Sequence, residues 1–185
     1  CKRGAAMARL KSLVYEEMTA AQKIAHDEIL SGPRTRIGGP MNAWFRNPEL
    51  AGLAQRLGAF CRFQTSLPPK LSELAILIVS RDWSAEVEWW VHQPIAVEAG
   101  IDAAITEAIR KRERPQFENR DEEVLYDFAS ELMADKSVTD KTYAAALAEF
   151  GEATVVELVA VLGYYTSVAM VLNAFEELPA DGTLP

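Results

Sequence analysis

The stretch LSELAILIVSRDWSAEVEWWVHQPIAVEAGI, at residues 71–101, decides how this chain folds. Its first half is apolar on nearly every side after Glu73, which predicts a central helix from Pro68-Pro69 to about Ser80. The β-branched residues there would also suit a strand, but the chain offers no other convincing strand to pair with it. We therefore expect this segment to be the innermost helix of an all-α domain.

The second half of the stretch predicts another helix. Ser84 is a suitable N-cap, and two acidic residues follow in the first turns, where the helix dipole favours negative charge. Gly100 is a natural residue to end this helix, and Pro94 should kink it or free backbone carbonyls.

Two carboxylates and one imidazole are expected to meet between these helices. Glu88 and His92 are four residues apart, so they share one face of the second helix. A break at Arg81–Ser84 can fold the first helix back, which would bring Glu73 to the same apolar pocket. This combination is typical of a proton-transfer site, although a Glu–His pair at this spacing is also a common surface or structural pair.

The rest of the chain also has helical periodicity, with Gly and Pro at the breaks. We expect further helices over residues 5–30, 48–63, 102–110, 119–135 and 139–150, and an apolar helix that follows Gly151. The sequence thus predicts a single-domain helical bundle over residues 37–178, preceded by a helix and loop at 1–36 and followed by a tail at 179–185.

Composition disfavours two classes of partner. The chain has 185 residues, 49% of them hydrophobic, and a formal net charge of −8. That charge disfavours nucleic acids and anionic membrane surfaces, because both attract basic proteins. The apolar run at residues 155–175 contains polar residues and lacks close Lys or Arg flanks, so we interpret it as a buried helix, at a subunit interface, rather than a membrane span.

The two cysteines, Cys1 and Cys61, are far apart and form no CxxC motif. Low cysteine content suits a reducing compartment. Because no signal-peptide pattern is present either, we expect a cytoplasmic protein.

The pattern of these residues resembles the carboxymuconolactone decarboxylase family, which includes the alkyl hydroperoxidase D-like proteins. The resemblance covers roughly residues 37–178. Its central elements are Glu73, Glu88-Trp89-x-x-His92 and Ala99-Gly100, and its flanking elements are Gly39-Pro40, Asn47-Pro48-Glu49-Leu50 and Leu172-Asn173-Ala174-Phe175. The resemblance implies the helical fold of that family. We expect identical chains to associate, as a trimer, a hexamer or another assembly that the sequence does not specify.

One departure from the family pattern changes the expected chemistry. The peroxidase branch carries a CxxC pair before the histidine, but the corresponding positions here are Ala85 and Glu88. Cys61 has no nearby resolving partner, so thiol peroxidase activity is not expected. The decarboxylase side of the family instead implies a reaction on a small carboxylate or lactone substrate that needs no cofactor.

For this reaction we assign the general acid/base role to His92. Glu88 would orient the imidazole or act as a base, and Glu73 would share a proton with Glu88. Candidate substrate-binding residues are Trp83 and Trp89 as pocket walls, Arg81 (or Arg34, Arg36 or Arg46) as the cation for a carboxylate, and Asn173 as a hydrogen-bond donor. Trp90 is more simply explained as core.

Two other readings remain open. Glu73, Glu88 and His92 could chelate a metal ion, although no further ligands stand at recognisable spacing, and our expectation is no metal. Alternatively the protein is a non-catalytic helical oligomer in which the Glu/His cluster is structural. Self-association is expected under every reading, because a short chain with so many apolar helices needs surface to bury them.

Overall fold

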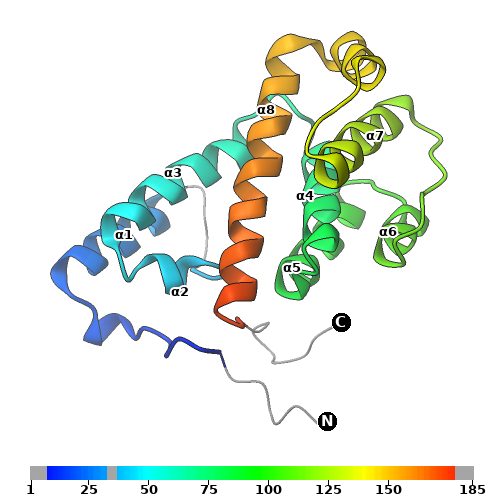
Figure 1. Ribbon diagram of the computed structural model, residues 1–185. Coiled ribbons are helices and arrows are strands. Elements are labelled where there is room, and N and C mark those ends of the chain that lie inside the picture. Colours follow the sequence, from blue (N-terminus) through cyan, green and yellow to red (C-terminus); the bar gives the residue numbers. More distant parts are fainter. Residues whose placement is uncertain (1–7, 33–36, 178–185) are drawn as a thin grey trace, which may run out of the picture.

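The computed structural model describes residues 8–32 and 37–177, and within them the chain is all-helical with no strand (Figure 1). The all-α prediction is therefore confirmed. The elements are a 3-10 helix, η1 (Tyr15–Glu17), and the α-helices α1 (Ala20–Ser31), α2 (Met41–Trp44), α3 (Pro48–Phe63), α4 (Pro69–Asp82), α5 (Glu86–Glu98), α6 (Ala103–Arg110), α7 (Arg120–Asp135) and α8 (Asp140–Ala174). The predicted tail at 179–185 lies outside the described residues.

Helix α4 is the centre of the fold. Every residue from Leu71 to Ser80 is buried, as the apolar sequence predicts. The helix packs against α5, α6, α7 and α8, so it touches most of the domain. In Figure 1 the longer part of α8, orange to red, runs between α1–α3 on one side and α4–α7 on the other. Side chains on α4 are consequently held by packing from several directions.

The turn between α4 and α5 differs from the prediction. Ser84 is not the N-cap of α5, because Ala85 occupies that position. Ser84 instead ends α4 in the left-handed conformation, with φ of +49°. Its N–H donates to the carbonyl of Arg81 (3.2 Å), and the N–H of Ala85 donates to the carbonyl of Ser80 (2.8 Å). This is the Schellman arrangement, which folds α5 back along α4.

Helix α5 ends as predicted, at a glycine with positive φ. Gly100 has φ of +106°, and the N–H of Ile101 donates back to the carbonyl of Ala96 (3.0 Å). Pro94 lies inside the helix. Because proline has no N–H, the carbonyl of Trp90, four residues earlier, lacks its helical donor.

The predicted helix at 5–30 is wrong in its first half. From residue 8 the chain is irregular up to η1, and α1 begins only at Ala20. Thr19 starts it with a capping box: its hydroxyl accepts from the N–H of Gln22 (3.3 Å), and the side chain of Gln22 accepts from the N–H of Thr19 (2.8 Å). This signal is local and outweighs the apolar spacing of the residues before it.

Helix α8 contains the predicted break at Gly151, whose φ of +77° is outside the helical region. Thr139 caps its first part as expected, and Asp102 and Asn47 cap α6 and α3. Within the described residues, α8 is the one helix long and apolar enough to cross a membrane. Half of its apolar window, 50%, is buried inside the protein. Length and composition alone are weak evidence for a membrane span, because core helices of soluble proteins pass the same test.

Candidate proton-transfer site

The structure brings Glu73 and His92 into direct contact. Glu73 lies on α4 and His92 on α5, and Oε2 of the carboxylate is 2.6 Å from Nδ1 of the ring. Each side chain is only 7% exposed. An ionised Glu73 accepts from Nδ1–H, which fixes the ring orientation and leaves Nε2 as the nitrogen available for chemistry.

Glu88 has a different environment, although it is one turn from His92 on the same helix. Both of its carboxylate oxygens are buried, and neither has a hydrogen-bond partner within the described part of the chain. Burial raises the pKa of Glu88 well above its usual range. The carboxyl group is therefore favoured in its protonated, neutral form. Glu73, rather than Glu88, is the carboxylate that orients His92.

Glu88 and His92 line a cavity of about 810 Å³. Its wall is formed by one face of α5, by α8, by the end of α3 and by the segment around α2. The wall is largely aromatic and aliphatic, and it includes Phe45, Phe63 and Trp90. Glu73 is not part of the wall, so it supports His92 from behind. This arrangement is typical of a ligand site, in which a few polar groups face a mostly apolar space.

Tyr165 on α8 is a further member of the site that the sequence analysis did not single out. Its ring packs edge-on against the ring of His92, with centroids 5.3 Å apart. Burial raises the pKa of Tyr165, and the positive charge of Arg62 partly opposes this effect. The hydroxyl is therefore neutral at ordinary pH. The adjacent tyrosines in the apolar part of α8 are the sequence signal for this position.

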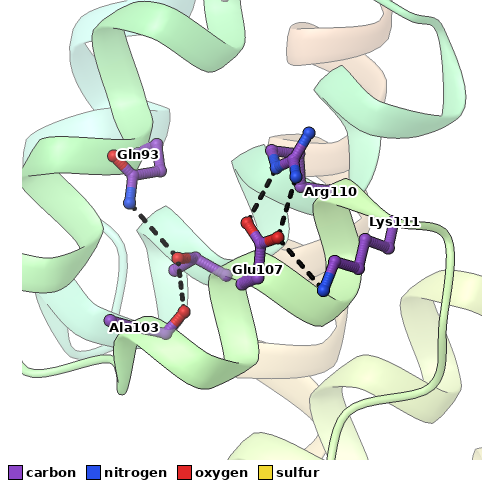
Figure 2. A network of polar contacts seen from close by, with 6 residues as sticks. Gln93, Ala103, Glu107, Arg110 and Lys111 are labelled. Atoms are coloured by element: carbon purple, nitrogen blue, oxygen red, sulfur yellow. Dashed lines mark hydrogen bonds and ion pairs between the residues drawn. The ribbon is translucent and has the colours of Figure 1, made fainter.

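Arg81 and Trp89, two of the predicted substrate-binding residues, lie away from this cavity. Both line a smaller cavity of about 180 Å³ together with Arg110. The guanidinium of Arg110 is paired with Glu107, since its Nε and one terminal nitrogen donate to the two oxygens of that carboxylate at 2.7 and 2.8 Å (Figure 2). Arg81 is likewise paired with Glu86 at 3.6 Å. Both described arginines at this smaller cavity therefore have an acidic partner, although the buried Nε of Arg81 has no hydrogen-bond partner among the described residues.

Asn173 and Trp83, also predicted to bind substrate, line neither of these two cavities. The amide of Asn173 donates to the main-chain carbonyl of Trp83 at 2.7 Å, which ties the end of α8 to the end of α4. Of the other cations considered, Arg46 donates to the carbonyl of Lys11. Arg34 and Arg36 lie outside the described residues. The large cavity is instead lined by Arg62, which the sequence analysis did not assign. Trp90 also lines it and is only half-buried, so the expectation that Trp90 belongs to the core is wrong.

Metal and thiol chemistry receive no support from the geometry. Among residues 8–32 and 37–177, no three His, Cys, Asp or Glu side chains are placed to hold a metal ion. Cys61 is buried on α3, and burial raises the pKa of its thiol to about 11, so it is poorly suited to act as a thiolate nucleophile.

Comparison with known proteins adds no assignment. No protein-family model and no curated protein sequence matches the chain. The chemistry of the cavity has to be argued from its own residues.

Proposed function

We propose that this protein catalyses proton transfer without a cofactor on a small carboxylate or lactone substrate, with decarboxylation as the leading reaction. The observation that carries the proposal is the pairing of two unlike carboxyl groups beside one imidazole. Glu73 is hydrogen-bonded to His92, whereas Glu88 is buried, unpartnered and favoured in its protonated form. Two titratable groups in such different environments can have pKa values that are far apart, which lets one site supply both a base and an acid.

In the proposed reaction His92 is the base and Glu88 the acid. Nε2 removes a proton from a carbon or oxygen of the substrate, and the imidazolium that forms is stabilised by the Glu73 carboxylate at Nδ1. Glu88 donates its proton to the substrate atom that gains negative charge. Water then returns a proton to Glu88 and removes one from His92.

Decarboxylation fits the same residues. The substrate carboxylate leaves as CO2, and its bonding electron pair moves into a conjugated carbonyl of the substrate. The resulting carbanion carbon takes a proton from the Glu88 carboxylic acid, and the ionised Glu88 is reprotonated from solvent.

The resemblance to the carboxymuconolactone decarboxylase family supports this proposal and extends it to the fold. The central elements of that resemblance are Glu73, the motif from Glu88 to His92, and Gly100. Glu73 lies on α4, the motif lies on α5, and Gly100 follows the end of α5. We therefore propose a fold of that family, in the branch without paired thiols.

A screen for exchange and CO2 release tests the proposed activity. Small lactone acids and conjugated carboxylic acids are incubated with the protein in D2O, and ¹H NMR follows deuterium incorporation and loss of substrate. We expect His92→Gln to lower the rate about 100-fold or more, because general acid–base catalysis typically contributes at least that factor. His26→Gln is the matched control, since His26 lies on α1 beside Asp27.

Two results would contradict the activity. One is the absence of both exchange and CO2 release across the panel. The other is a folded His92→Gln variant that turns over at the wild-type rate. Either result would favour the alternative of a helical oligomer in which the Glu/His cluster is structural.

We also propose that the protein associates with copies of itself through α3. Leu50, Leu53, Leu57 and Phe60 are exposed and follow the i, i+3, i+7, i+10 spacing of one helix face. Monomeric proteins rarely leave such a continuous apolar surface in water, and a second copy would cover it with the same stripe. Light scattering after size exclusion measures the mass, and Leu53→Glu should dissociate the assembly. A wild-type monomer would refute this part of the proposal.

A further inference from the structure

The wall of the large cavity contains a single cation within the described parts of the chain, Arg62. It lies on the last turn of α3 and is half-buried. Its guanidinium lies over the ring of the adjacent Phe63, with Cζ 5.3 Å from the ring centroid. Stacking of this kind orients a guanidinium without using its hydrogen-bond donors.

Arg62 is also unusual among the arginines of this protein. Its side chain makes no hydrogen bond or ion pair with any residue in the described ranges. Every other described arginine makes at least one, namely Arg9, Arg46, Arg56, Arg81, Arg110, Arg112, Arg114 and Arg120. A half-buried guanidinium whose five donors are free in a cavity wall is suited to bind an anionic ligand.

The charge of Arg62 also reaches the catalytic side chains. It acts on the Tyr165 hydroxyl, where it opposes the effect of burial on the pKa, and the Tyr165 ring is in contact with His92. Because Arg62 and His92 line the same cavity, a ligand held at Arg62 would share that cavity with the imidazole.

Two acidic side chains, Glu88 and Glu177, also line the described part of this wall. Glu88 is favoured in its neutral form by burial. The remaining acid, Glu177, accepts a hydrogen bond from the amide of Asn42 at 3.2 Å. Phe45, Phe63 and Trp90 supply flat apolar surface for the body of the ligand.

We infer that Arg62 binds the carboxylate of the substrate, and that the substrate class is small, flat, conjugated carboxylates. The guanidinium would hold the two carboxylate oxygens through paired N–H donors, while the conjugated body lies against the aromatic wall and presents its reacting carbon to His92 and Glu88. This inference deepens the proposed function, because it takes the cavity to be the place of that reaction, but the binding it predicts can be measured without turnover.

Binding of two acids and their amides tests the inference. The probes are benzoate with benzamide and hexa-2,4-dienoate with hexa-2,4-dienamide, each pair alike in shape and different in charge. Ligand-detected NMR titrations give the dissociation constants. In the wild type we expect each acid to bind about tenfold or more tightly than its amide, as is typical of one charge-assisted contact.

Variants assign that preference to one residue. Arg62→Gln should weaken binding of the acids about tenfold and leave the amides unchanged, and Arg62→Lys should recover part of the preference because it keeps the charge but loses the paired geometry. Arg56→Gln is the control on the same helix, since Arg56 pairs with Glu28 at the surface. Its binding should equal that of the wild type.

Three outcomes overturn the inference: no binding of either acid, equal binding of acid and amide to the wild type, or an unchanged preference in Arg62→Gln. The result is separable from the proposed function. If His92→Gln binds the acids normally and the wild type never exchanges or decarboxylates any substrate, Arg62 is a carboxylate site in a protein without the proposed chemistry. If turnover is found but Arg62→Gln leaves acid binding intact, only the assignment of Arg62 fails.

Discussion

Replacing Glu88 by glutamine should change how the stability of this protein depends on pH. The carboxyl group is buried without a hydrogen-bond partner, and burial raises its pKa in the folded state. In the unfolded chain a glutamate has a pKa of about 4.3. Above that pH the unfolded chain releases a proton that the folded protein retains, so unfolding becomes easier as the pH rises. Glutamine has the same shape and never ionises.

The magnitude follows from the count of one proton. A single retained proton lowers the free energy of unfolding by about 1.4 kcal/mol for each pH unit, from the unfolded pKa up to the folded pKa. The contribution of Glu88 to stability is thus fully present below its pKa in the unfolded chain. It is lost as the pH rises through its pKa in the folded protein. The free energy of unfolding of Glu88→Gln should therefore rise relative to that of the wild type from pH 5 upward. The rise should be about 1.4 kcal/mol for each pH unit, until the carboxyl group of Glu88 ionises in the folded wild type.

Urea unfolding at several pH values between 4 and 8 measures this difference, at one fixed protein concentration because self-association would contribute to stability. The control is Glu98→Gln, an exposed acid at the end of the same helix, whose curve should run parallel to that of the wild type. If the Glu88→Gln curve is also parallel to the wild type over this range, the carboxyl group is already ionised in the folded protein. The assignment of Glu88 as the acid would then be refuted.

Three further predictions concern stability, and each is measured by urea unfolding. Ser84→Gly should stabilise the protein by about 0.5–1 kcal/mol, because Ser84 has positive φ, whereas Ser84→Ala should bring no gain. Leu77→Ala should cost about 2–5 kcal/mol, since Leu77 is fully buried in α4, and an effect below 1 kcal/mol would mean that this core is loosely packed. Thr19→Ala should cost about 1 kcal/mol by removing the capping box of α1, and an unchanged midpoint would show that tertiary contacts, not the cap, set the start of that helix.

The sequence predicts the central part of this fold well because its signals there are strong and consistent. The continuous apolar run of α4 can only be satisfied in the interior, and Gly100 and Gly151 stand where the backbone needs positive φ. Ser84 was misread because a serine before acidic residues has the chemistry of an N-cap. Its left-handed conformation depends on how α5 must fold back, which local sequence does not encode.

Part of the candidate site could likewise be predicted from the sequence, and part could not. Spacing along α5 was enough to place Glu88 and His92 on one face, and both line the cavity. Spacing could not tell which carboxylate touches the imidazole, because Glu73 reaches it through the packing of α4 against α5. Arg62 could not be found at all from sequence, since α3 and α5 are far apart in the chain and a lone arginine near a helix end usually faces water.

The proline within α5 has a consequence for how this cavity can diversify. Pro94 supplies no N–H to the carbonyl of Trp90, and Trp90 belongs to the cavity wall. A residue of the cavity wall therefore carries a main-chain oxygen that lacks its helical donor. Substitutions at position 90 can reshape the wall over evolutionary time, yet they leave this acceptor in place. Only loss of Pro94 would give this carbonyl a helical donor again. The shape of the wall at position 90 and the presence of this acceptor can therefore change independently in evolution.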